Sequence, residues 1–173
     1  MKDILLNDGN TIPAIGFGVY MIPNDGSTYN AVKEALRVGY RHIDTAAAYF
    51  NEAEVGKAIQ DSGIPREEIF VTSKLRNAAH GYQATLEAFD MTLSRLGLRY
   101  LDLYLIHWPI PRKHDDDWQQ LNRETWRAME KLYREGRVRA IGVSNFKPRH
   151  LDALLEKADI APMVDQIELH PGM

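Results

Sequence analysis

Cysteine is absent from the 173-residue sequence, which excludes disulfide bonds, thiolate metal sites and cysteine nucleophiles. The formal net charge of -3 gives no strongly basic surface for nucleic acid or for an anionic membrane. Hydrophobic residues make up 45% and charged residues 26% of the chain, a balance typical of a soluble domain. We therefore expect one domain over residues 1–173, without a nucleic-acid or membrane partner.

We expect neither a secretory signal peptide nor a membrane span. Residues 1–8 lack the apolar core of a signal peptide, and no apolar run approaches the ~18 residues that span a bilayer. The absence of cysteine suits a reducing compartment. These features together predict a cytoplasmic protein.

A glycine-rich phosphate loop is missing from its usual place after the first strand of a nucleotide-binding open sheet. The sequence there is Thr45-Ala46-Ala47-Ala48-Tyr49. Strand-like segments begin near residues 40, 69, 101, 138 and 163, and helical patterns separate them. Spacings of roughly 25 to 37 residues are typical of βαβ units. The pattern predicts a parallel α/β fold, either a barrel or an open sheet, and the missing loop favours the barrel.

The expected elements follow from apolar periodicity and from turn residues. A hairpin over residues 3–18 precedes βα units over residues 28–173. Gly16 and Gly18 indicate either close backbone approach or a plain loop. Asn51 and Glu54 suggest a capping box, and Ser27 a further helix cap. The expected helices span residues 28–38, 52–61, 82–96, 123–135 and 148–157, and the expected strands span 40–43, 69–73, 101–106, 138–143 and 163–169.

Reactive side chains follow three of these strands. Asp44 and Tyr49 follow the first strand, Lys74 follows the second and His107 follows the third. Because parallel strands end on one rim, these four side chains should converge. An Asp–Lys pair alone is more often structural, and a lone histidine before Trp-Pro is more often a loop residue. The combination of all four side chains at the ends of neighbouring strands favours a functional site.

This set suits proton transfer to a carbonyl oxygen. A free phenol has a pKa of about 10, and a nearby ammonium lowers that pKa by stabilising the phenolate. Lys74 fits this role, Asp44 can hold Lys74, and His107 can form a hydrogen bond beside Tyr49. The strand ends carry no Ser or Cys nucleophile paired with a base, and no second carboxylate placed as in a glycosidase pair. A nicotinamide cofactor would then supply the hydride.

From its hairpin to His170-Pro171, the sequence resembles the aldo-keto reductase family. The resemblance is carried by the segments Asp44–Tyr49, Lys74 and Leu105–Pro109. It implies a TIM (β/α)8 barrel, truncated here to about five βα units. It also implies that Tyr49 is the general acid, that Lys74 and Asp44 tune it, and that His107 orients the carbonyl.

The same resemblance implies a cofactor site and a substrate pocket. Ser144, Asn145 and Gln166, with Asp44, would bind the nicotinamide end of NADPH, although NADH is possible. Asn145 and Gln166 otherwise suit an N-cap and a buried polar residue. The pocket for a small carbonyl substrate would be lined by Tyr20 and Trp108, which otherwise suit core or hairpin packing.

Two charged features bear on the substrate and on metal binding. Arg76 stands where the family often has tryptophan, so it either favours anionic substrates or faces solvent. The triplet Asp115-Asp116-Asp117 suits a solvated loop, with a divalent metal site as the alternative. We expect no metal.

Five strands cannot close an eight-stranded barrel. We therefore expect Tyr40–Ile43 and Met163–Leu169 to be sheet edges, with an apolar sheet face left open. These features predict self-association and weak NADPH binding by this chain alone. The function candidates are a carbonyl reductase, a cofactor-binding regulatory module and an inactive half-barrel that self-associates.

Overall fold

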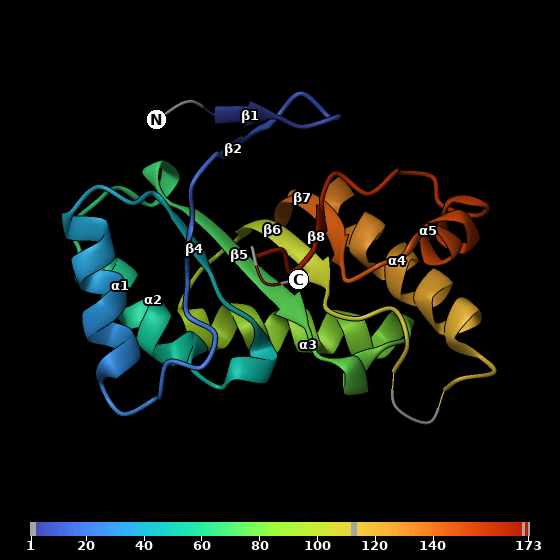
Figure 1. The fold of residues 1–173 in the computed structure, drawn as a ribbon, viewed down its shortest axis with the longest axis horizontal. Helices are drawn as coiled ribbons and strands as arrows, with labels where there is room; N and C mark the ends of the chain where they lie inside the picture. The colour runs from blue at the N-terminus through green and yellow to red at the C-terminus, as the bar shows by residue number, and fades with distance from the viewer. Residues whose placement is uncertain (1–2, 112–113, 171, 173) are drawn as a thin grey trace.

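The computed structural model describes residues 3–111, 114–170 and 172. Six parallel strands form a curled sheet in the order β3-β4-β5-β6-β7-β8, with helices packed against its outer face (Figure 1). The strands are β3 Phe17–Gly18, β4 His42–Asp44, β5 Phe70–Leu75, β6 Leu101–Ile106, β7 Val138–Ser144 and β8 Asp165–Gln166. The helices are α1 Ser27–Arg37, α2 Glu52–Gln60, α3 Tyr82–Leu96, α4 Trp118–Arg134 and α5 Pro148–Leu155. This arrangement confirms the partial barrel.

The sheet contains a strand that the sequence pattern did not predict. β3 pairs in parallel with β4, through Phe17 opposite Ile43 and Gly18 opposite Asp44. β4 is therefore an inner strand, and the expectation that Tyr40–Ile43 forms a sheet edge is wrong. Within the described residues, β3 and β8 are the edges. A two-residue strand that contains glycine is too short to show a period of two.

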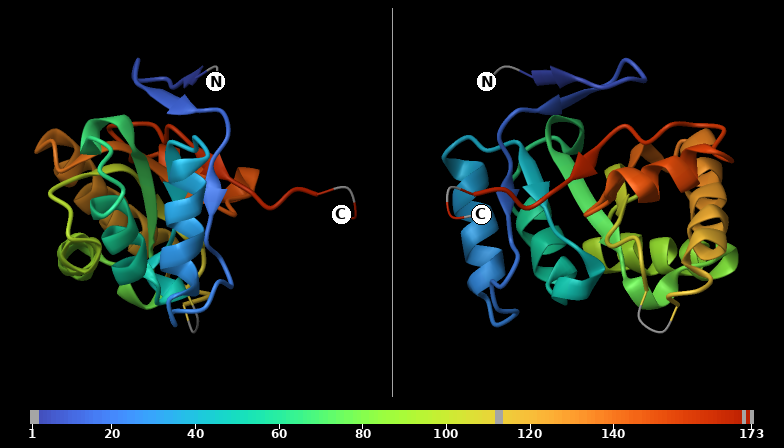
Figure 2. Two further views of the ribbon diagram at one scale, coloured as in Figure 1. Left: turned by 90° about the vertical axis from the view of Figure 1, so that its left-hand side faces the viewer. Right: turned by 45° about the vertical axis from the view of Figure 1, so that its right-hand side comes forward.

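The hairpin covers one end of the sheet. Its strands, β1 Asp3–Leu5 and β2 Thr11–Pro13, pair antiparallel and lie beyond the sheet in both views of Figure 2. Leu6 packs with Leu103, Leu105 and Ala140 on the inner face. The apolar side chains of β4 to β7 are all buried or half-buried, so the expected open apolar face is not found there.

The edge at β8 is short. Only Asp165–Gln166 forms the expected strand 163–169, and Ile167 and Leu169 beyond it are 59% and 81% exposed. The segment after β8 leads away from the body of the molecule (Figure 2). Self-association stays a prediction, and these two exposed side chains are where it would begin.

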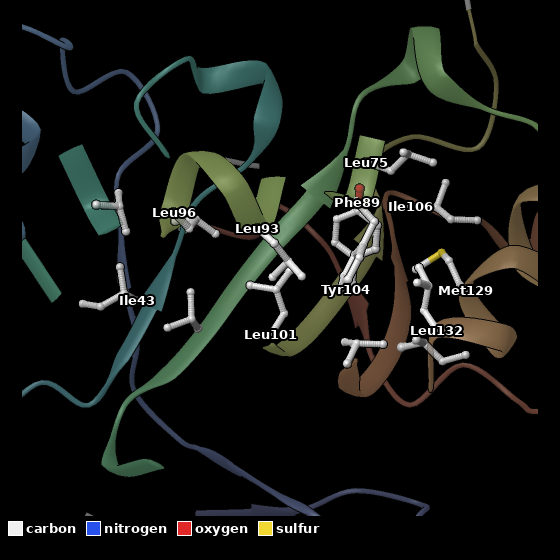
Figure 3. Packing of buried hydrophobic residues seen from close by; sticks show 14 of the residues in the cluster. Ile43, Leu75, Phe89, Leu93, Leu96, Leu101, Tyr104, Ile106, Met129 and Leu132 are labelled. Atoms are coloured by element: carbon white, nitrogen blue, oxygen red, sulfur yellow. The ribbon is translucent and has the colours of Figure 1, made fainter. Parts of the chain in front are cut away.

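The main core lies between the sheet and the helices. Phe89 of α3 meets Tyr104 of β6 edge to face, with ring centroids 5.0 Å apart. Burying one such large side chain contributes about 1.5–3 kcal/mol relative to leaving it exposed. Figure 3 shows this core from nearby, with ten residues labelled: Ile43, Leu75, Phe89, Leu93, Leu96, Leu101, Tyr104, Ile106, Met129 and Leu132.

Helix ends differ from the sequence expectation. Glu54 accepts hydrogen bonds from the backbone amides of Gly26 (2.6 Å) and Tyr29 (2.9 Å), so it caps α1 rather than its own helix. Ser27 is the first residue of α1 and makes no capping bond. Because Glu54 bonds to α1, the expected capping box of α2 is wrong. α4 begins at Trp118, five residues before the expected start at residue 123.

Asn51 has a different role from the expected one. Its side chain is buried and donates to the backbone oxygens of Val19 (3.0 Å) and Ile22 (3.2 Å). It also accepts a hydrogen bond from the Thr45 hydroxyl at 3.0 Å. Asn51 thus ties the loop after β3 to the loop after β4, where the predicted site residues lie.

Candidate active site

The predicted catalytic residues come together at the carboxyl ends of the strands. Asp44 is the last residue of β4, Lys74 is near the end of β5, and His107 follows β6. Tyr49 ends a short 3-10 helix, Ala47–Tyr49, that begins three residues after Asp44. Because β4, β5 and β6 are parallel neighbours, one rim carries all three strand ends.

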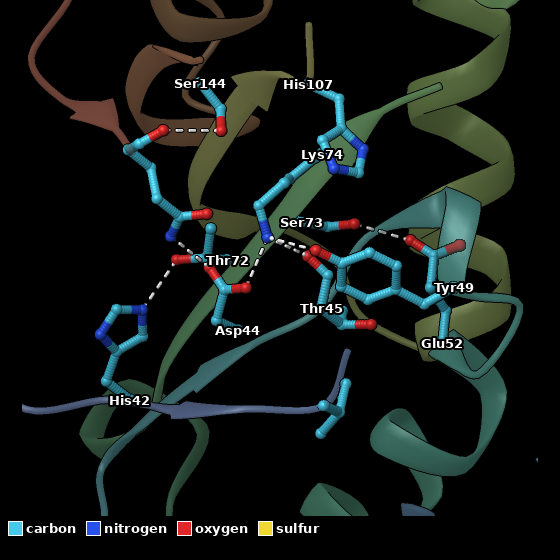
Figure 4. Close-up of polar contacts among 12 residues, drawn as sticks. His42, Asp44, Thr45, Tyr49, Glu52, Thr72, Ser73, Lys74, His107 and Ser144 are labelled. Carbon is cyan, nitrogen blue, oxygen red and sulfur yellow. Dashed lines mark hydrogen bonds and ion pairs between the residues drawn. The ribbon is translucent and has the colours of Figure 1, made fainter. Parts of the chain in front are cut away.

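Lys74 lies at the centre of this group. Its Nζ is 2.5 Å from Asp44 Oδ1, 3.0 Å from the Thr45 carbonyl oxygen and 3.4 Å from the Tyr49 hydroxyl. The Lys74 side chain is only 1% exposed, and that of Asp44 is 15% exposed. Figure 4 shows Lys74 pointing toward both Asp44 and Tyr49. A buried ammonium needs such partners, because burial without them disfavours the charge.

The phenol of Tyr49 does not have the lowered pKa that the sequence argument expected. Burial first, and then the Asp44 carboxylate, raise the pKa of Tyr49 to about 12. The ammonium of Lys74 is close, but the Asp44 charge lies beside it and offsets its effect on the phenolate. Burial also lowers the pKa of Lys74, and the contact with Asp44 opposes that change. Tyr49 is therefore a protonated phenol at neutral pH.

His107 lies against the phenol. The His107 and Tyr49 rings meet edge to face, with centroids 5.7 Å apart. Burial and the Lys74 charge lower the pKa of His107 to about 4. At neutral pH the imidazole is uncharged and offers one N–H donor and one acceptor.

The predicted cofactor residues adjoin the same group. The Ser144 hydroxyl donates to the Gln166 carbonyl oxygen at 2.8 Å. Asn145 Nδ2 donates to the His107 carbonyl oxygen at 2.9 Å, and Gln166 Nε2 donates to Asp44 Oδ2 at 2.9 Å. Asn145 has a left-handed backbone, with φ of 62°, which asparagine tolerates better than most residues. These contacts join β7 and β8 to the carboxylate that binds Lys74.

Two side-chain amide oxygens beside these contacts remain available as hydrogen-bond acceptors. Asn145 Oδ1 and Gln166 Oε1 form no hydrogen bond within the part of the chain that the structure describes. The two residues line a cavity together with Ser144. Free acceptors beside a hydroxyl suit a carboxamide, which has two N–H donors and one acceptor. The residues present therefore fit the nicotinamide end of a dinucleotide.

The cavity has a volume of about 480 Å³. It contains every predicted site residue except Asp44, whose carboxylate contacts Lys74 and Gln166. Tyr20 and Trp108 are 68% and 49% exposed, so neither is a core residue. The ring centroids of Tyr20 and Tyr49 are 5.0 Å apart. Three other residues line the cavity, Ala48, Ile167 and Glu168, and no distinctive sequence pattern predicts them.

Two further expectations concern charge. Arg76 is exposed, and its guanidinium lies 5.0 Å from the centre of the Phe50 ring. The aspartates 115–117 are exposed before α4. Across residues 3–111, 114–170 and 172, no group of three or more His, Asp or Glu side chains is placed to bind a metal. In the same residues, no helix combines the length and apolar character of a membrane span.

Comparison with known proteins assigns the family. The family model described as "Aldo/keto reductase family" matches residues 14–172. An aldo-keto reductase of Mycolicibacterium smegmatis is 55% identical over 168 residues, which cover 97% of this chain and 58% of that protein. A glyoxal reductase of Bacillus subtilis is 51% identical over 174 residues, which cover 100% of this chain and 60% of that protein. The chain belongs to the aldo/keto reductase family and spans about three fifths of these relatives.

Solved structures agree with this assignment. An aldo/keto reductase from Brucella melitensis superposes with a TM-score of 0.91 at 53% identity, covering 98% of this chain and 64% of the other. A Bombyx mori aldo-keto reductase in complex with NADP superposes with a TM-score of 0.86 at 41% identity, covering 97% and 58%. The curled sheet is therefore part of the barrel of this family.

Proposed function

We propose that this chain carries the carbonyl-reducing part of an NAD(P)H-dependent aldo-keto reductase, which converts aldehydes or ketones to alcohols. The observation that carries the proposal is the position of Lys74 Nζ, 2.5 Å from Asp44 Oδ1 and 3.4 Å from the Tyr49 hydroxyl. That hydroxyl belongs to a residue that lines an accessible cavity. A bound nicotinamide cofactor supplies the hydride.

Tyr49 is the general acid in this proposal. With its pKa raised to about 12, the phenol keeps its proton throughout the neutral range. A carbonyl oxygen that gains negative charge becomes basic enough to take that proton. The Lys74 ammonium then stabilises the phenolate that remains, and Asp44 keeps the ammonium in place.

His107 positions the carbonyl. Its ring is neutral at pH 7, because its pKa is lowered to about 4. A neutral imidazole can donate one hydrogen bond to the carbonyl oxygen without competing as an acid. The edge-to-face contact keeps the His107 ring beside the Tyr49 ring, and both residues line the same cavity. This is electrostatic stabilisation of developing charge by preset donors.

Ser144, Asn145 and Gln166 would hold the nicotinamide carboxamide through their hydroxyl and amide groups. NADPH is the cofactor that we propose, with NADH possible, and the NADP complex of the Bombyx mori relative supports the NADP form. The substrates are small carbonyl compounds, and the glyoxal reductase of Bacillus subtilis supports this class. The cytoplasm is the proposed location.

Cofactor binding and turnover, measured together, test this function. NADPH binding is followed by cofactor fluorescence, and turnover by loss of NADPH absorbance after addition of a small aldehyde. Both are measured on the 173-residue chain and on any longer product of its gene. Aldehyde-dependent oxidation of NADPH supports the reductase. Cofactor binding without turnover in the longest product contradicts it and favours a regulatory module.

A further inference from the structure

A second cavity of about 600 Å³ opens next to the proposed active site. Ala48, His107 and Trp108 line both cavities, so the two share a wall and are contiguous there. A substrate whose carbonyl meets Tyr49 can therefore extend past Trp108 into the second cavity. The remaining side chains of that cavity determine what the far end of the substrate can be.

Among the described residues that line this second cavity, Arg76 is the one lysine or arginine, and His114, which also lines it, contacts Asp117 at 2.9 Å. The described lining contains no carboxylate, and Arg76 forms no ion pair within the described residues. Its guanidinium is held against the Phe50 ring at 5.0 Å from the centroid, which limits where the charge can lie. Phe50 directly follows the proposed acid, Tyr49, in the sequence. The cavity thus carries a positive charge beside the reacting centre.

The position of Arg76 along the chain sets the backbone distance between Arg76 and Lys74. Arg76 continues β5 in an extended conformation, with φ of -64° and ψ of 144°. Alternate residues of an extended strand face the same side, so Arg76 follows Lys74 on one face at about 7 Å along the strand. The Arg76 backbone therefore lies two residues beyond the lysine whose Nζ is 3.4 Å from the Tyr49 hydroxyl.

Polar atoms of the same cavity also lack partners. Both ring nitrogens of His80 and Oδ1 of Asn77 are buried without a hydrogen bond in the described part of the chain, and both residues line the cavity. Buried polar atoms in folded proteins usually have a hydrogen-bond partner. The wall of the cavity beside Arg76 is therefore polar.

We propose that this second cavity binds a carboxylate carried by the substrate, and that Arg76 determines specificity for carbonyl compounds with such a distal group. One guanidinium matches one negative charge, and its fork of N–H donors fits a carboxylate. The inference rests on the proposed reductase function, because it names the substrate class of that site.

Two matched aldehydes test the preference. The first is para-carboxybenzaldehyde, whose carboxylate lies across the ring from the carbonyl, and the second is its neutral methyl ester. The ratio of their kcat/KM values is measured for the wild type, Arg76→Met, Arg76→Lys and Arg99→Met. Arg99 is an exposed arginine at the opposite end of the sheet, before β6, and it serves as the control.

We expect the wild-type ratio to favour the carboxylate and to fall about tenfold in Arg76→Met, the size of one charge-assisted contact at a partly exposed site. Arg76→Lys should retain part of the preference, and Arg99→Met should retain all of it. Added salt should reduce the wild-type ratio. An equal ratio in the wild type and in Arg76→Met overturns the proposal.

A binding measurement separates this proposal from the reductase function. Calorimetry with para-hydroxymethylbenzoate, the corresponding alcohol, needs no turnover. Weaker binding to Arg76→Met than to Arg99→Met supports the carboxylate site even if neither aldehyde is reduced. Equal binding to both variants overturns the site, whether or not the methyl ester is reduced.

Discussion

Gln166 of β8 donates a hydrogen bond from Nε2 to Asp44 Oδ2 of β4 at 2.9 Å, although 122 residues separate them in the sequence. The other oxygen of the same carboxylate binds Lys74. Asp44 is therefore shared between the proposed proton-transfer group and the proposed cofactor site. A substitution at Gln166 should therefore also affect the contact between Asp44 and Lys74, because both contacts use the same carboxylate.

Replacing Gln166 with leucine should destabilise the chain by about 1 kcal/mol, because a bond to a partly buried carboxylate is lost. Urea unfolding monitored by circular dichroism measures this change. Gln83→Leu is the control, since Gln83 donates to Glu87 on an exposed helix face and its loss should cost at most about 0.5 kcal/mol. Equal costs for the two variants would count against a structural role for the Gln166 contact.

The two partners of the buried ion pair should differ in cost. Asp44→Asn leaves the Lys74 ammonium, which is 1% exposed, without a counter-charge, whereas Lys74→Met leaves an Asp44 side chain that is 15% exposed and still bonded to Gln166. We expect Asp44→Asn to cost more, within the range of about 3–5 kcal/mol for a broken buried pair. The double variant should cost less than the sum. Additive urea-unfolding energies would contradict the direct contact.

Gly16 should tolerate no side chain. A Cβ there would lie 2.7 Å from Nδ1 of His42, which is buried and contacts Thr72 Oγ1 at 2.9 Å through its other ring nitrogen. Gly16→Ala should therefore cost about 1–3 kcal/mol by overpacking. Gly18→Ala is the matched control, because no atom lies within 4 Å of its Cβ position. Thermal unfolding of both variants measures the stability that each one loses. Equal losses would contradict the clash with His42.

The stability of the fold should decrease between pH 6.5 and about pH 4. His80 and His107 have pKa values lowered to about 4, against about 6.5 in an unfolded chain. As pH falls through this window, the unfolded state binds protons that the folded state does not, so unfolding becomes easier. The slope is at most about 1.4 kcal/mol per pH unit for each histidine, and less for His107, which is only partly buried.

Urea unfolding at several pH values measures that slope. The double variant His80→Gln/His107→Gln should have a shallower pH dependence than the wild type. His170→Gln, at an exposed position after β8, should keep the wild-type slope. A double variant with an unchanged slope would show that these two histidines are not responsible.

Much of the site follows from one rule about parallel strands. Asp44, Lys74 and His107 were predicted to converge because they end neighbouring strands, and α3 was predicted at its observed bounds, Tyr82–Leu96. Those segments are long enough for their hydrophobic period to be recognised from the sequence alone. Strand β3 has two residues and shows no period, so it was missed.

Other features depend on contacts between distant segments. The capping role of Glu54 requires the position of α1 against α2, and the bond from Gln166 to Asp44 requires the curl of the whole sheet. The raised pKa of Tyr49 depends on its burial and on the Asp44 charge, and residue types alone give no measure of burial. Local sequence pattern does not contain these distances.

Tyr49→Phe removes only the hydroxyl that would donate the proton, so it tests whether Tyr49 is the general acid. The measurement is the rate of NADPH oxidation with a small aldehyde, in the longest product of the gene that binds cofactor. Tyr82→Phe, at the start of α3 and lining neither cavity of the site, is the control. We expect a loss of at least ~10²-fold in turnover for Tyr49→Phe, with cofactor affinity retained. Turnover equal to that of Tyr82→Phe would contradict this role of Tyr49.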